Sequence, residues 1–194
     1  MRRSSTALSG SGSATRVAGV SSGSELARLI LRVTVGGTMI AHGVRHGRTL
    51  DGTARWFGSI GFRRPRLQAT TSAAVEIGAG AAIVAGIATP VAASAVVGTM
   101  AVAARTVHIP NGFFVVGEGY EYVGNLATTS VALAAMGPGR WSLDRALGLH
   151  EWGTPAKRVA LAAGLGLAGA AAQLALFWRK PATEDAVDGA AGQG

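Results

Sequence analysis

The stretch RTVHIPNGFF, residues 105–114, follows a long apolar run and indicates that a membrane-embedded helix ends here. Residues 91–104 contain no charged side chain, so Arg105 and His108 come at the end of a segment that water would solvate poorly. The proline lacks a backbone N–H and the Asn-Gly pair accepts positive φ, which predicts a sharp turn over residues 110–112. Charged groups at the end of an apolar helix, followed by two aromatic rings, are typical of a membrane protein with a polar site at one face.

The composition of the whole chain favours the same class. Of the 194 residues, 48% are hydrophobic and only 14% are charged, whereas soluble domains carry roughly 25% charged residues. The formal charge is +8, and the basic residues cluster between apolar runs. This arrangement predicts the lipid bilayer with anionic headgroups as a partner, and no nucleic acid. The chain has no cysteine, so thiolate chemistry, disulfides and iron–sulfur ligation are excluded for this polypeptide.

Five apolar runs predict an all-α integral membrane bundle with four core helices and an additional C-terminal transmembrane helix. The predicted spans cover residues 26–44, 67–88, 91–109, 121–136 and 159–178. The fourth span, with sixteen residues, is short for a bilayer crossing.

The chain divides into four regions on this basis. Residues 1–24 are predicted to be a disordered basic tail, and residues 181–194 a disordered acidic tail. Residues 25–147 hold the four-helix core, and residues 148–180 hold a connection followed by the fifth helix.

Two connections have helical character. The basic segment 45–66 carries Trp56, Phe57, Ile60 and Phe62 on one face, which indicates either a short helix lying in the headgroups or a solvated loop. In a later connection, Ser142 is a plausible N-cap for a short helix.

Two charged residues fall near the middle of predicted spans. Arg32 lies in the first span and Glu76 in the second, at depths of roughly 18 and 14 Å from the same face on a rise of about 1.5 Å per residue. A lone charge in the bilayer is costly, so we expect Arg32 and Glu76 to form an intramembrane ion pair.

A second polar group gathers near the ends of the spans. Five side chains lie within a few residues of one face and form the candidate ligand-binding site: His42, Arg105, His108, Glu121 and Asn125. Arginine could hold an anion or a quinone oxygen, and a histidine could relay a proton near neutral pH. No metal site is predicted, because no local carboxylate completes a recognised ligand set with the histidines.

Several motifs together resemble the DoxX family of bacterial membrane proteins. They are ILRVTVG at 30–36 leading to His42-Gly43, AVE at 74–76, HIPNGF at 108–113, GYEY at 119–122 and GPGRWSLD at 137–144. The resemblance covers about residues 26–147 and implies a four-helix core. Many members carry lysine where this sequence has His46, and the fifth span lies outside the resemblance.

The resemblance also implies that the protein lies in the cell membrane of a bacterium and takes part in redox reactions there. Family members are linked to sulfur-compound handling and oxidative stress, which implies a non-catalytic subunit or anchor of an oxidoreductase assembly with other redox proteins as partners. The alternatives are a subunit that binds a quinone or a small anion, and a small-molecule transporter. No intrinsic cofactor is expected, quinone is the candidate ligand, and a homo-oligomer is an open alternative.

Overall fold

The computed structural model describes residues 12–181, with side chains placed from residue 22 onward, and this part of the chain is all-α. The expected fold class is confirmed. The helices are α1 (Gly12–Arg48), α2 (Leu50–Ser59), α3 (Pro65–Ala85), α4 (Thr89–Ala103), α5 (Glu121–Met136), α6 (Leu143–Ala146) and α7 (Pro155–Phe177).

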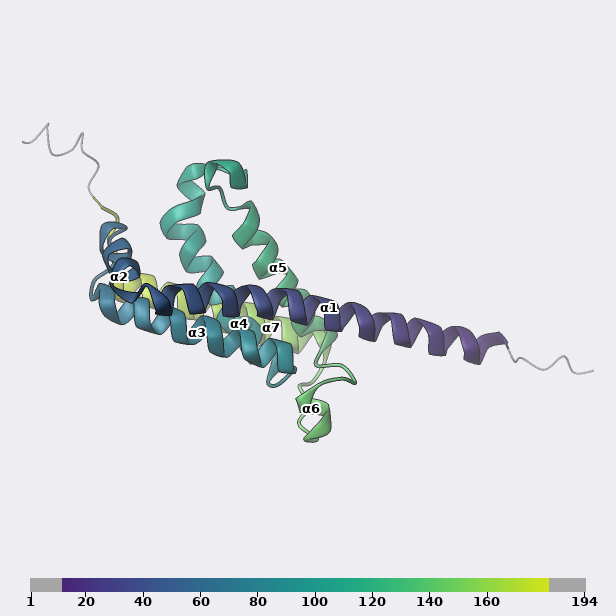
Figure 1. Cartoon of the computed structure of the whole chain (residues 1–194). Helices are drawn as coiled ribbons and strands as arrows, with labels where there is room; N and C mark the ends of the chain where they lie inside the picture. Colours follow the sequence, from purple (N-terminus) through teal and green to yellow (C-terminus); the bar gives the residue numbers. More distant parts are fainter. Residues whose placement is uncertain (1–11, 182–194) are drawn as a thin grey trace, which may run out of the picture.

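Helices α1 and α3 lie side by side along the bundle, and α4 packs mainly against α7 and α5. Figure 1 shows α2 at one end of the bundle and α6 at the other. The segment between α4 and α5 projects to one side of α1 and α3 in this view. The two ends of the bundle are therefore built from different short helices, and each end has its own polar groups.

Three helical segments are long and apolar enough to cross a bilayer: Pro65–Ala85, Thr89–Asn111 and Pro155–Phe177. The protein is therefore a multi-pass membrane protein, and the C-terminal helix is one of its candidate spans. Helix α5 is a helix as expected, but its 16 residues give a length of about 24 Å, less than the roughly 30 Å of a hydrocarbon core.

The first helix differs from the expected one at its start. Disorder was expected over residues 1–24, whereas α1 begins at Gly12 and runs without a break into the first expected span. Extending an existing helix costs no new nucleation, so a Ser- and Ala-containing segment follows the packed part of α1 into helix. Residues 1–11 and residues 182–194 lie outside the described part of the chain.

The end of the second long apolar segment confirms the expected turn. After α4 the chain continues through a π-helical turn (Ala104–His108) and a 3₁₀ turn (Ile109–Asn111). The helix stops at Gly112, whose φ of +82° favours glycine.

Both short connecting helices are present. In α2, Phe57 is buried while the neighbouring Trp56 is 44% exposed, as expected of an amphipathic helix rather than a loop. In α6, the Ser142 hydroxyl accepts a hydrogen bond from the Arg145 N–H at 3.2 Å, which confirms the N-cap.

The main core lies between the long helices. Its fully buried side chains are Val35, Met39, Ile83, Val96 and Leu133, from α1, α3, α4 and α5. Helix α7 approaches α4 closely because Gly166 has no side chain, and a Cβ there would lie 2.7 Å from the Ser94 carbonyl oxygen. The apolar core leaves few places for polar side chains, so those that are buried must find partners inside the bundle.

Candidate functional site

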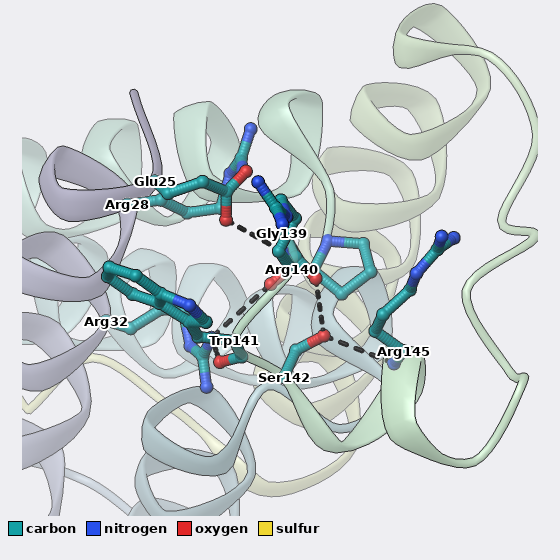
Figure 2. A network of polar contacts seen from close by, with 9 residues as sticks. Glu25, Arg28, Arg32, Gly139, Arg140, Trp141, Ser142 and Arg145 are labelled. Carbon is teal, nitrogen blue, oxygen red and sulfur yellow. Dashed lines mark hydrogen bonds and ion pairs between the residues drawn. The ribbon is translucent and has the colours of Figure 1, made fainter. Parts of the chain in front are cut away.

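Arg32 is buried and donates hydrogen bonds to four backbone carbonyl groups. Its Nε lies 2.9 Å from the Ile83 oxygen, and its Nη2 lies 2.5 Å from the Val84 oxygen. Its Nη1 bonds the oxygens of Trp141 at 2.6 Å and Pro138 at 3.3 Å, and Figure 2 shows these two contacts. The guanidinium thus joins α1 to the last turn of α3 and to the loop after α5.

Arg32 and Glu76 therefore do not pair, and the expected ion pair is wrong. The last carbonyls of a helix lack intrahelical donors, so the end of α3 offers acceptors to a cation. Seven residues separate Glu76 from Ile83 along α3, a rise of about 10 Å. Arg32 thus lies beside the end of α3, and Glu76 needs partners of its own.

Those partners are His46 of α1 and Ser72 of α3. The Ser72 hydroxyl donates to Glu76 Oε1 at 2.6 Å. His46 Nδ1 lies 3.1 Å from Glu76 Oε2, although no hydrogen-bond donor among the described residues is aligned with that buried oxygen. When the imidazole is protonated, this contact becomes an ion pair.

The approach of α1 to α3 at this level depends on Gly43. A Cβ at Gly43 would lie 2.8 Å from the Ala73 oxygen and 2.9 Å from the Glu76 Cβ. The absence of a side chain at Gly43 thus lets the two helices pack closely enough for His46 to reach the Glu76 carboxylate.

His46, Ser72 and Glu76 line a cavity of about 120 Å³ between α1, α2, α3, α4 and α7. Its other walls are largely apolar and include the rings of Trp56 and Phe57. The remaining lining residues are Ile60, Thr71, Val75, Thr99, Val102, Ala103, Thr106 and Gln173. A buried carboxylate and an imidazole at the wall of an apolar space form the candidate site.

Gln173 brings α7 into this site. Its Nε2 donates to Gln68 Oε1 of α3 at 2.8 Å, and Gln68 is buried. The C-terminal helix therefore contributes a wall of the cavity as well as a candidate span.

The five side chains expected at the span ends do not line this cavity. His42 stacks on the Tyr122 ring with centroids 6.2 Å apart, and Arg105 lies 4.7 Å from the centroid of the Trp178 ring. The structure thus places His42 and Arg105 against different aromatic partners.

The other three residues lie in and beside the connection between α4 and α5. His108 Nδ1 is 2.6 Å from the Glu118 carbonyl oxygen, and Glu121 Oε2 accepts from the Val115 N–H at 3.0 Å. Asn125 donates to the Glu121 carbonyl at 3.0 Å. These contacts order the connection, and a ligand-binding role for the five residues stays a prediction.

His46 and Ser72 were not among the expected site residues. The i, i+4 spacing of Ser72 with Glu76 on α3 could have indicated Ser72. Residues at this spacing share a helix face, so the partner of a buried Glu76 could be sought one turn away.

The comparisons with known proteins give one match. The DoxX family model matches residues 27–109. These residues include most of α1, the whole of α2 and α3, and the second apolar segment up to Ile109. No curated protein and no solved structure shows significant similarity to the chain. The GYEY and GPGRWSLD motifs lie outside the matched residues, so the match covers a shorter range than the expected 26–147.

Proposed function

The chain carries a DoxX-family domain over residues 27–109, and on that premise we propose that it is a membrane subunit of an oxidoreductase assembly that binds a quinone head group beside His46 and Glu76. The observation that supports this proposal is the apolar cavity with a carboxylate and an imidazole at its wall. We place the protein in the cell membrane of a bacterium, where lipid-soluble quinones carry electrons.

The size and lining of the cavity suit a single aromatic ring. Its volume of about 120 Å³ is close to the roughly 150 Å³ of an apolar protein cavity that binds benzene. Trp56 and Phe57 offer ring faces for stacking. His46 offers a ring N–H to a quinone oxygen.

The two ionisable side chains provide a route for protons. Reduction of a quinone to the hydroquinone consumes two electrons and two protons. In this proposal His46 passes each proton to the quinone oxygen and takes one back from Glu76, which is reprotonated from water. The Ser72 hydroxyl holds the carboxylate toward His46.

The electrons come from a partner protein in this proposal. The chain has no cysteine, so it cannot ligate an iron–sulfur cluster through thiolates or cycle a dithiol. A flavin- or metal-containing redox protein would pass the two electrons to the bound quinone. The subunit thus contributes the quinone site, the proton route and the attachment to the bilayer.

Fluorescence quenching tests the proposed site. Purified protein in detergent is titrated with a short-chain benzoquinone, which quenches nearby tryptophan. We expect saturable quenching that Trp56→Phe largely removes. His46→Gln and Glu76→Gln should each weaken binding by about tenfold, the value of one hydrogen bond to a charged group.

His42→Gln serves as the matched control. His42 lies one turn from His46 on the same helix and does not line the cavity. If His42→Gln weakens binding and His46→Gln does not, the quinone binds near the span ends instead. If quenching never saturates, the protein has no quinone site.

A further inference from the structure

A basic cleft lies at the α6 end of the bundle, where the loop after α5 meets α1 and the start of α7. Its volume is about 370 Å³. We call it the arginine cleft, after four of its lining residues: Arg28, Arg140, Arg145 and Arg158. In Figure 2, Arg28 comes from α1, Arg140 from the loop and Arg145 from α6.

One carboxylate, Glu25, lines the cleft together with these four arginines. Glu25 forms an ion pair with Arg28 and accepts a hydrogen bond from the Arg140 N–H at 2.7 Å. In the described part of the chain, the Glu25–Arg28 contact is the only ion pair that any of the four arginines forms. With His150 neutral, four positive charges and one negative charge leave the cleft at a net +3.

Arg158 donates several hydrogen bonds, but none of them goes to a carboxylate. Its Nε donates to the Ala134 oxygen at 3.0 Å, and its two terminal nitrogens donate to the oxygens of Ala135 and Gly153. All three acceptors are neutral carbonyls. The guanidinium is therefore fixed in place beside the cleft without being neutralised.

In the described part of the chain, Arg145 has no carboxylate partner. Its Nη1 lies 2.8 Å from His150 Nε2. A guanidinium can only donate, so Nε2 is the acceptor and the proton of the neutral ring is on Nδ1. The Arg145 charge is therefore not neutralised, and the net positive charge of the cleft is what an anion would satisfy.

The surroundings of the cleft are apolar and exposed. Four large side chains in and beside α6 point outward: Trp141, Leu143, Leu147 and Leu149. An exposed tryptophan with leucines between basic residues is typical of a segment at the membrane interface. The guanidinium groups then lie at the depth of the phosphates, where basic pockets between membrane helices bind lipid headgroups.

From these observations we propose that the arginine cleft binds the phosphate of an anionic phospholipid headgroup. The negative charge of the phosphodiester is held by Arg140 and Arg145, which are exposed and line the cleft. This site lies at the opposite end of α3 from the His46–Glu76 cavity and does not depend on the quinone proposal.

Native mass spectrometry of the full-length protein tests this assignment. The protein is released from detergent in the presence of phosphatidylglycerol or phosphatidylcholine with the same acyl chains. We expect retained phosphatidylglycerol and little retained phosphatidylcholine. Arg140→Gln and Arg145→Gln should each weaken phosphatidylglycerol binding by about fivefold, as expected for one basic residue at an anionic lipid surface.

Lys157→Gln is the matched control, since it removes one exposed positive charge at the same end of the bundle but outside the cleft. Equal weakening by Lys157→Gln and Arg145→Gln would mean diffuse attraction and overturn the assignment. Equal retention of the two lipids would overturn it as well. Displacement of phosphatidylglycerol by millimolar inorganic phosphate would show a site for a soluble anion instead of a lipid.

Discussion

Gly36 of α1 and Gly80 of α3 face each other where the two helices cross, and neither has room for a side chain. A Cβ at Gly36 would lie 2.5 Å from the Gly80 carbonyl oxygen, and a Cβ at Gly80 would lie 2.6 Å from the Gly36 oxygen. Small residues let membrane helices approach to backbone contact. This contact holds the two helices that carry Arg32, His46 and Glu76.

Gly36→Ala should therefore destabilise the protein by roughly 1–3 kcal/mol, as overpacking of a tight contact does. Gly37→Ala is the control, because a Cβ at Gly37 meets nothing within 4 Å and alanine favours helix by about 1 kcal/mol. Thermal unfolding in detergent compares the two variants. Equal melting temperatures would mean that the helices can separate at this crossing without cost.

Because Arg32 and Glu76 have separate partners, the effects of mutating them on stability should be additive. Arg32→Gln should lower stability by about 3 kcal/mol, because it removes charged donors from buried carbonyls. Glu76→Gln should have its own smaller effect, and the double variant should equal the sum of the two within about 0.5 kcal/mol. A double-mutant cycle by chemical unfolding measures this. Rescue of one variant by the other would show that the two side chains interact after all.

Asp144 of α6 is fully buried and caps the start of α4. Its carboxylate accepts from the Ala88 N–H at 2.9 Å and the Thr89 N–H at 3.4 Å, and from Trp152 Nε1 at 3.1 Å. Asp144→Ala leaves these donors without an acceptor and should cost about 1–3 kcal/mol. Limited proteolysis between α6 and α7 should then become faster.

The control for this prediction is Glu151→Ala, since the Glu151 side chain is 90% exposed. It should not change the melting temperature or the rate of cleavage. If both variants are cleaved at the wild-type rate, Asp144 does not hold the loop in place.

The sequence predicted the helices well, because apolar runs and breakers such as the Pro-Asn-Gly turn at 110–112 act locally. It also indicated that Glu76 had to be neutralised inside the bundle. It did not identify the partner, because the depth estimate took the first span to end at residue 44 and the second to start at residue 67. Helix α1 runs to Arg48 and α3 starts at Pro65, so Arg32 lies farther along the bundle than Glu76, beside the backbone carbonyls at the end of α3.

The arginine cleft also could not be predicted from the sequence. Arg28 and Arg140 are more than a hundred residues apart, and only the packing of α1 against the loop after α5 brings them together. The carbonyl contacts of Arg158 have no sequence pattern at all. Side chain to backbone contacts between distant segments depend on the assembled fold, so residue type and spacing do not reveal them.

Glu25 predicts how stability depends on pH. Burial by itself would raise the pKa of this carboxyl, but the Arg140 N–H and the Arg28 guanidinium outweigh it and lower the pKa below the ordinary value of 4.5. Because the folded protein favours the ionised form, the stabilisation is fully present above this ordinary value and is lost as pH falls through the lowered pKa. Wild type should therefore melt at a higher temperature than Glu25→Gln at neutral pH, and the gap should shrink as the pH falls below 4.5. Glu151→Gln, at an exposed position, should match wild type at both pH values. A gap between wild type and Glu25→Gln that stays constant on acidification would mean that the Glu25 charge contributes nothing to the fold.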